Sequence, residues 1–362
     1  MKKIISSVIL VLFIVLSFGG LYYLTTKYHY ISSFETLNNY LYFFLWLLIW
    51  FFIHAVIHEL GHLVWGLICG YRLLSFRFLF FEIYRLNDHF KFKLSSLEGK
   101  VGQTVFCDLT DKNRKHSYLI IGGILNLLLT VGILVTLLKV NPFIDYFYTN
   151  SRFISGIYVG IFYVLFTLIP FFLFSNNDCI LFMMTFNKEA NESYKIIGQA
   201  KYSLSNGGSY KDLAIKPINN PQNEIEGERC LLYYYQLIDR DLDGASSLAA
   251  SEYLQSLYNN NEVTGLIRGW INLEYIYSII MDNPKLAKKI YQELKPGVKR
   301  LLDKSYSPYF ARINYAIHKE ILKSLNENII KETKELIARS KFQADVDINQ
   351  KLFTKYYKSN NK

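Results

Sequence analysis

Residues 40–69 form an apolar run in which four ionisable side chains are embedded, His54, His58, Glu59 and His62. An apolar stretch of about 20 residues is enough for a helix to cross the roughly 30 Å hydrocarbon layer of a membrane. Each charged residue near the centre of such a helix costs about 2.5–3.5 kcal/mol, so an ionisable cluster in a span indicates a functional site by default. The run therefore predicts a membrane helix that contains a functional site.

Residues 58–62 read His-Glu-Leu-Gly-His, an HExxH motif. Residues four apart share one face of a helix, so His58 and His62 can reach the same metal ion. Glu59 follows the first histidine, where its carboxylate can take a proton from a water on the metal. Catalytic zinc sites combine three protein ligands with an open position for water, whose pKa zinc lowers toward about 7. We therefore expect His58 and His62 to be metal ligands and Glu59 to be the catalytic base.

Two further interpretations concern this segment. The motif can belong to a helix turn that emerges at the membrane surface, where His and Glu side chains are solvated. His54 lies one turn before His58 and fits no ligand pattern that the site needs. We therefore expect His54 to pack between helices or to support a ligand from behind, rather than to bind metal.

Three other segments are as long and apolar as a span requires, namely residues 4–25, 117–138 and 153–174. The first also has the form of a signal peptide, with two lysines before an apolar stretch, but no convincing cleavage site follows it. We favour an uncleaved helix. Together with 40–69, these segments predict a mainly α-helical, polytopic membrane bundle of about four spans.

Basic residues between the spans set the expected orientation. The loop 70–116 carries nine Lys or Arg residues, whereas 26–39 carries one and 139–152 carries two. The positive-inside rule then places the long loop, the N-terminus and the C-terminus in the cytoplasm. The net charge of +10 follows from this topology and from contact with anionic lipid, so it does not indicate nucleic acid. The four scattered cysteines indicate reduced thiols.

The chain of 362 residues changes character near residue 187. Almost all long apolar runs precede this point, and most Lys, Asp, Glu and Asn residues follow it, in a chain that is 51% hydrophobic overall. We predict a membrane domain, 1–186, and a cytosolic α-helical domain, 187–362. The Trp-x-x-Leu-x-x-x-Tyr pattern that starts at Trp270 favours helical hairpins or a short array similar to tetratricopeptide repeats. We expect this domain to dock a partner or to gate the membrane site.

A third metal ligand is expected after the fourth span, 153–174, where the apolar run breaks at residues 175–177 just before Asp178. The second and fourth spans both run from outside to inside, so the HExxH motif and Asp178 arrive at a similar depth near the cytoplasmic face. A carboxylate at that level completes a His/His/Asp site for zinc. The alternative is that Asp178 caps the short helix 179–186.

These motifs resemble those of the site-2 protease family of intramembrane zinc metalloproteases, peptidase family M50. The resemblance covers roughly residues 40–186. It rests on HELGH in one span, on GGILNLLL at 122–129 in the next, and on a proline followed by an aspartate in the last. The two glycines of the middle motif also serve a plainer purpose, because small residues let helices approach closely.

The resemblance implies roles for individual residues. In this family the HExxH histidines and a later aspartate bind zinc and the glutamate is the base, which implies these roles for His58, His62, Asp178 and Glu59. Asn126, in a small-Gly-x-x-Asn element, is implied to bond the substrate backbone or the developing oxyanion. The chain departs from the family in the last motif, where Thr167 replaces the common Asn and Cys179 replaces the Gly.

The loop 70–116 contains the segment YRLLSFRFLFFEIYRLNDHFKFKL, in which apolar and basic residues alternate. This period of two predicts β structure or a sheet at the membrane surface. An exposed strand edge near the metal can hold a substrate segment extended by main-chain pairing, which exposes peptide bonds that a helix shields. A loop that lies on the lipid headgroups through its aromatic and arginine residues fits the pattern equally well.

Two functions from different classes follow. The first is an intramembrane zinc endopeptidase that cuts a membrane-anchored regulator, a signal-peptide remnant or a peptide precursor. The second is a catalytically silent membrane scaffold that binds membrane segments and presents the helical domain; the intact HExxH motif favours the enzyme. Expected partners are the substrate, the lipid bilayer and a cytosolic protein bound by 187–362. The bias toward Lys, Asn, Ile and Tyr favours an AT-rich bacterial genome, so we expect the membrane to be a bacterial cytoplasmic membrane.

Overall fold

The computed structural model describes residues 37–94, 102–109, 116–140, 147–169, 177–242, 244–260, 262–263, 265–304 and 307–359. These residues are mainly helical, with one small antiparallel sheet. The chain divides into two compact units. The first contains residues up to Tyr84 together with Lys91–Lys188, and the second contains Arg85–Phe90 together with Glu189–Lys362.

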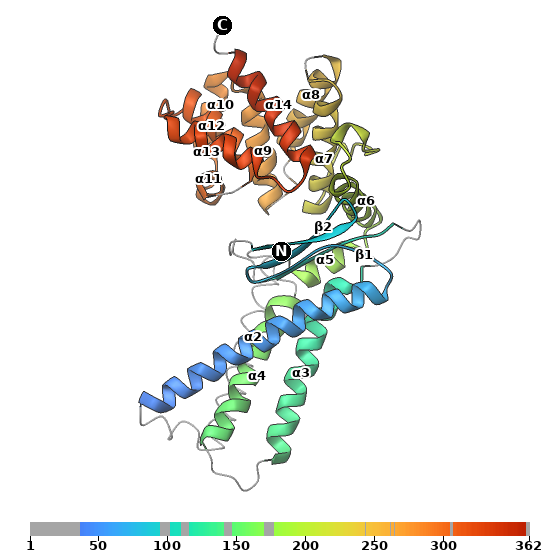
Figure 1. Ribbon diagram of the computed structural model, residues 1–362, viewed down its shortest axis with the longest axis vertical. Coiled ribbons are helices and arrows are strands. Elements are labelled where there is room, and N and C mark those ends of the chain that lie inside the picture. Colours follow the sequence, from blue (N-terminus) through green and yellow to red (C-terminus); the bar gives the residue numbers. More distant parts are fainter. Residues whose placement is uncertain are drawn as a thin grey trace. The chain divides into compact units, whose positions relative to one another are not determined.

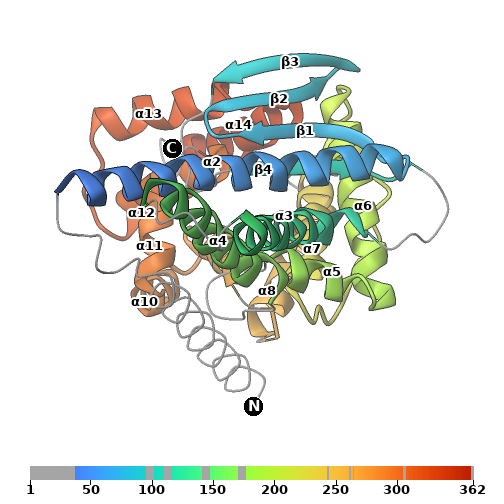
Figure 2. The same cartoon turned by 90° about the horizontal axis from the view of Figure 1, so that it is seen from below.

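Three long helices of the first unit pack against one another pairwise, as both overall views show (Figure 1, Figure 2). They are α2 (Leu37–Ile68), α3 (Tyr118–Val140) and α4 (Phe147–Leu168). A short helix, α5 (Asp178–Met184), contacts α3 and α4. Buried Ile133 and Leu137 of α3 meet buried residues of α4 in an apolar cluster. The three long helices therefore form one packed bundle.

Two of the described helices are long and apolar enough to cross a membrane, at Leu41–Ile68 and Tyr118–Lys139. The apolar part of α4, Arg152–Leu168, is shorter. The expected span 4–25 lies outside the described residues, as do residues 170–174 of the expected fourth span. A bundle of four spans is therefore not confirmed, and the described part of the chain provides two candidate spans.

The surface of α2 has the apolar character that lipid requires. Many large apolar side chains on this helix are half exposed or more, and they include Leu41, Phe44, Leu48, Phe52, Val64 and Ile68. An apolar surface of this extent is rare on soluble monomers and marks contact with a membrane or another protein. The exposure thus agrees with the hydropathy of the helix in indicating membrane association.

The loop after α2 contains the sheet, in the strand order β3-β2-β1-β4. Its strands are β1 (Arg72–Phe78), β2 (Phe81–Leu86), β3 (His89–Leu94) and β4 (Gly102–Cys107). β2 and β3 are joined at Asn87 and Asp88, which both adopt positive φ, the backbone conformation that tight hairpin turns favour and that Asn and Asp tolerate best. β1 and β4 contact α2 (Figure 2). The predicted β structure in this segment is therefore present.

His116 lies buried where the sheet meets the start of α3, between the rings of Tyr71 and Tyr118. Burial lowers the pKa of His116 to about 4, although the charge of Asp108 opposes the effect. Between pH 6.5 and 4 the unfolded chain therefore binds more protons at this histidine than the folded chain does. The contribution of His116 to the free energy of unfolding is complete above pH 6.5 and is lost as the pH falls toward 4.

A His116→Gln variant should make the stability of the protein depend less steeply on pH in this range. We expect the thermal midpoint of metal-free wild type in detergent to fall between pH 7 and 5 more steeply than that of the variant, because a pKa lowered from 6.5 to about 4 costs the folded protein about 2 kcal/mol by pH 5. Other groups titrate in both proteins, so the difference between the two slopes isolates His116. Equal slopes would show that the pKa of His116 is not lowered in the folded protein.

The helices of the second unit begin at recognisable signals. They are α6 (Lys188–Ser205), the 3-10 turn η2 (Tyr210–Asp212), α7 (Glu224–Arg240), α8 (Ala245–Asn259), α9 (Gly265–Ile279), α10 (Pro284–Glu293), α11 (Pro296–Lys304), α12 (Pro308–Glu320), α13 (Glu327–Ala338) and α14 (Gln343–Ser359). The side chains of Asn223, Asn283 and Asn326 accept hydrogen bonds from the first turns of α7, α10 and α13. Such caps satisfy backbone N–H groups that have no partner within the helix. The predicted helical character of this region is present.

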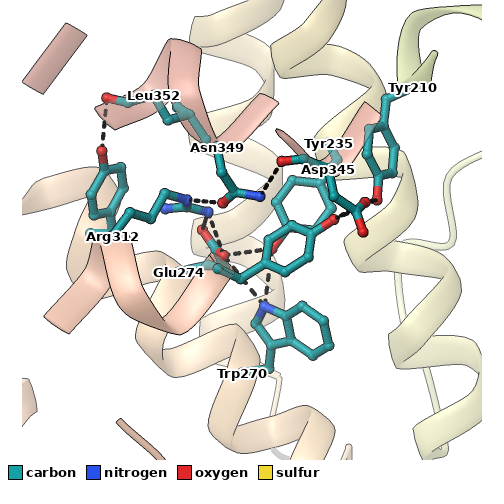
Figure 3. A network of polar contacts seen from close by, with 10 residues as sticks. Tyr210, Tyr235, Trp270, Glu274, Arg312, Asp345, Asn349 and Leu352 are labelled. Atoms are coloured by element: carbon teal, nitrogen blue, oxygen red, sulfur yellow. Dashed lines mark hydrogen bonds and ion pairs between the residues drawn. The ribbon is translucent and has the colours of Figure 1, made fainter. Parts of the chain in front are cut away.

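A buried ion pair connects α9 and α12 within the second unit (Figure 3). Nη2 of Arg312 lies 2.6 and 2.7 Å from the two carboxylate oxygens of Glu274, and both side chains are fully buried. Nε of Arg312 donates to Asn349 of α14 at 2.7 Å. Tyr235 and Trp270 donate to the same oxygen of Glu274. The network ties four helices of the unit together and pairs each buried charge, as burial requires.

Candidate metal centre

The imidazoles of His58 and His62 and the carboxylate of Asp178 converge on one point. His58 Nε2 lies 3.1 Å from His62 Nε2, and Asp178 Oδ2 lies 3.0 and 3.3 Å from these two nitrogens. Tetrahedral zinc with bonds of about 2.0–2.1 Å places its ligand atoms about 3.3 Å from one another. The triangle of donor atoms therefore has nearly the size that a zinc ion requires, and this group can hold a metal.

The three side chains of this triangle come from two positions far apart in the sequence. His58 and His62 come from consecutive turns of α2, whereas Asp178 is the first residue of α5. The two histidines are less than one-tenth exposed. Among the described residues, this is the one group of three or more His, Cys, Asp or Glu side chains with converging ligand atoms.

The start of α5 distinguishes between the two roles predicted for Asp178, which are metal ligand and helix cap. The helix cap is Asn177, whose side-chain oxygen accepts the N–H of Ile180 at 3.0 Å. The amide nitrogen of Asn177 donates to the carbonyl groups of Phe166 and Ile169 at the end of α4. Asn177 therefore caps the helix, and the carboxylate of Asp178 faces the two histidines.

A backbone carbonyl orients the second histidine. His62 Nδ1 lies 2.5 Å from the carbonyl oxygen of Tyr118, the first residue of α3. Since a carbonyl only accepts, Nδ1 carries the proton and Nε2 presents its lone pair to the metal position. Support of this kind from behind fixes the tautomer and ring orientation of a metal-bound histidine.

Glu59 lies beside the same group, between α2 and the sheet. It is 8% exposed and is close enough to both histidines and Asp178 to interact with all three electrostatically. The hydroxyl of Thr104 in β4 is 3.4 Å from Glu59 Oε2. A Cβ atom built on Gly102 would overlap the Glu59 carboxyl group, so the start of β4 fits closely against this side chain.

Asn126 is fully buried and lies between two histidine rings of α2. Its side-chain oxygen is 3.0 Å from His54 Nδ1, and its side-chain nitrogen is 3.3 Å from His58 Nδ1. His54 is also fully buried. The structure thus brings His54, which the sequence predicts as a packing or supporting residue, into a chain of polar contacts that leads to His58.

Gly122 lets α3 approach His58 and His62. A Cβ atom at this position would lie 2.7 Å from the carbonyl oxygen of His58 and 2.8 Å from ring nitrogens of both His58 and His62. We expect Gly122→Ala to displace the two histidines at a cost of about 1–3 kcal/mol, typical of overpacking, and to weaken zinc affinity about tenfold or more. Gly132→Ala on the same helix meets nothing within 4 Å and should bind zinc like wild type. Equal affinity of the Gly122 variant in a zinc titration would contradict this packing argument.

Several residues of the site are not predicted by the sequence. Tyr118 acts through its backbone carbonyl, which has no residue-type signature. Gly102 and Thr104 approach Glu59 only because the loop folds into a sheet that contacts α2. Gly122 belongs to a small-residue motif in the sequence, but its close approach to His58 and His62 follows from the crossing of α2 and α3.

Comparison of the chain with family models, with curated proteins and with solved structures finds no match.

Proposed function

We propose that this chain is an intramembrane zinc endopeptidase of the site-2 protease type. The observation that carries the proposal is the convergence of His58, His62 and Asp178 beside Glu59, all within or next to a helix apolar enough to span a membrane. Two neutral imidazoles and one carboxylate are a common ligand set for catalytic zinc, and three protein ligands leave a fourth position for water or substrate.

The chain's own residues divide the chemistry among them. His58, His62 and Asp178 hold the ion, which when bound polarises the scissile carbonyl and acidifies a water molecule. Glu59 accepts a proton from the attacking water at its carboxylate and passes it to the leaving amine nitrogen. The close fit of β4 around Glu59 limits the freedom of this carboxylate. A substrate segment held extended alongside the sheet would present its peptide bonds for attack, since a helical segment shields them.

The depth of the site supports cleavage within the membrane. Arg152 donates to the Tyr42 hydroxyl at 2.7 Å and stacks over Trp46 at 5.2 Å, a group of side chains typical of a membrane surface. His58 and His62 follow Trp46 by 12 and 16 positions, which is about 18 and 24 Å along a helix. In a hydrocarbon layer of about 30 Å, the metal ligands then lie inside the span and closer to its far end.

The proposal extends to location and partners. We place the chain in a bacterial cytoplasmic membrane with both termini in the cytoplasm, where the basic loop 70–116 favours the inner face. The substrate is a membrane-anchored protein or peptide. The helical region 187–362 is then available to a cytosolic protein, as its content of helices and charged residues suggests.

The test is a comparison of protein N-termini in membranes from cells with and without the chain. An endopeptidase of this type produces new N-termini that lie inside apolar segments of single-span proteins and that disappear when a zinc chelator is present. The catalytically silent scaffold produces no such termini, although it can still bind zinc and membrane segments. A set of N-termini that is the same in both membranes would therefore favour the scaffold.

A further inference from the structure

The side chain of Asn126 bridges two imidazoles that lie one helical turn apart on α2. His54 Nδ1 is 3.0 Å from Asn126 Oδ1, and His58 Nδ1 is 3.3 Å from Asn126 Nδ2. The other ring nitrogen of His58, Nε2, faces Asp178 and His62. The three side chains therefore form a continuous line of polar contacts that ends at the metal position. All of it is buried.

Aromatic side chains hold the far end of this line in place. The ring of His54 stacks on the ring of Tyr163 of α4, with centroids 5.8 Å apart and an angle of 16° between the planes. The ring of Trp50 lies 6.1 Å away from the same imidazole. His54 thus has little freedom to turn, and it gives the amide of Asn126 a fixed partner.

Metal binding dictates the proton positions along this line. A histidine that binds metal through Nε2 carries its proton on Nδ1, so His58 Nδ1 must donate. The acceptor in reach is the amide of Asn126, provided that its oxygen faces His58. Side-chain amide nitrogen and oxygen exchange places by a half turn that moves no other heavy atom. After this turn the amide nitrogen donates to His54 Nδ1, and each of these contacts joins a donor to an acceptor.

We propose that Asn126 and His54 are positioning residues that hold His58 in its metal-binding tautomer and orientation. This inference rests on the proposed metal site. It assigns Asn126 to the support of a ligand, whereas the family resemblance implies a bond to substrate or oxyanion. The arrangement is the counterpart, for His58, of the Tyr118 carbonyl that supports His62.

Zinc and cobalt titrations of detergent-purified protein test the assignment without any substrate. We expect Asn126→Leu to weaken metal affinity about 10–100-fold, as loss of such support does in other metal sites. Asn126→Asp should restore it, because a carboxylate accepts from His58 Nδ1. The visible spectrum of bound cobalt should be that of wild type in the Asp variant and altered in the Leu variant, since it reports ligand geometry.

Two further variants separate support from general packing. His54→Phe keeps a ring beside Tyr163 but removes both nitrogens, so it should weaken metal affinity in the wild-type background and have no further effect in Asn126→Leu. Thr130→Val is the matched control, since the hydroxyl of this buried residue donates to the backbone carbonyl of Asn126 at 2.7 Å. It should bind metal like wild type.

The outcomes distinguish this inference from the proposed function. If wild type binds no metal, the proposed function fails and the inference fails with it. If wild type binds zinc and Asn126→Leu binds it equally well, the metal site stands and the positioning role is wrong. If the Leu variant keeps full affinity but loses cleavage, Asn126 acts on the substrate. If Asn126→Leu does not fold, metal affinity in His54→Phe and Asn126→Asp decides, and wild-type affinity in His54→Phe would overturn the positioning role.

Discussion

Glu59→Gln should abolish peptide cleavage and leave the metal in place. Glutamine keeps the size of the side chain and can still contact Thr104, but it cannot accept the proton of the attacking water. Loss of a general base lowers rates by about 10²–10⁴-fold. We therefore expect cleavage of a membrane-embedded substrate to fall by at least a hundredfold, with zinc content unchanged. The measurement is the rate of product formation in liposomes at saturating zinc.

Glu252→Gln is a matched control, because the same chemical change is made at an exposed position of α8. Its cleavage rate should equal that of wild type. A Glu59→Gln variant that retains cleavage would exclude Glu59 as the base. A variant that loses zinc together with cleavage would instead place Glu59 among the residues that hold the metal.

Breaking the Arg312–Glu274 pair should strongly destabilise the second unit. Glu274→Ala leaves a fully buried guanidinium without its carboxylate, and removal of one partner of a buried ion pair typically costs about 3–5 kcal/mol. Tyr235 loses its acceptor at the same time, whereas Trp270 keeps the Tyr235 hydroxyl as an acceptor. Because the free energy of unfolding falls by about 1–3 kcal/mol per molar urea, we expect the urea midpoint to fall by about 1 M or more.

Urea-dependent proteolysis of the full chain in liposomes measures this effect, since it reads the fraction of unfolded chain outside the bilayer. The paired replacement Glu274→Met with Arg312→Met removes both charges and should recover much of the lost stability. Arg339→Met breaks an exposed ion pair with Glu335 on α13 and should cost less than about 1 kcal/mol. If Glu274→Ala behaves like Arg339→Met, the ion pair contributes nothing to the fold.

The sequence predicts site residues best where burial of a side chain costs the most free energy. Ionisable side chains in an apolar run have few explanations, so residue types and spacing alone predict roles for His58, Glu59 and His62. Their spacing on one helix face brings the two imidazole nitrogens together, and the structure has them 3.1 Å apart. The prediction for Asp178 rests on an expected topology in which two spans run in the same direction and end at the same depth, and the described residues, with two candidate spans, do not confirm that topology.

The rest of the site depends on contacts that residue types do not specify. The family resemblance implies a bond from Asn126 to the substrate or the oxyanion. Its place between His54 and His58 depends on how α3 crosses α2. The Tyr118 carbonyl becomes a support only through the same crossing. In the second unit, Glu274 stands in a mostly apolar stretch of α9, which is a signal for a buried partner, but sequence alone does not select Arg312 as that partner.

The zinc content of detergent-purified protein is the most decisive measurement for the metal centre, when wild type is compared with His58→Ala, Asp178→Ala and Glu59→Gln. We expect about one zinc per chain in wild type and in Glu59→Gln, because the three protein ligands remain in both. Zinc should be lost from His58→Ala and from Asp178→Ala. Wild type without zinc, or zinc that survives Asp178→Ala unchanged, would contradict the metal centre described for this chain.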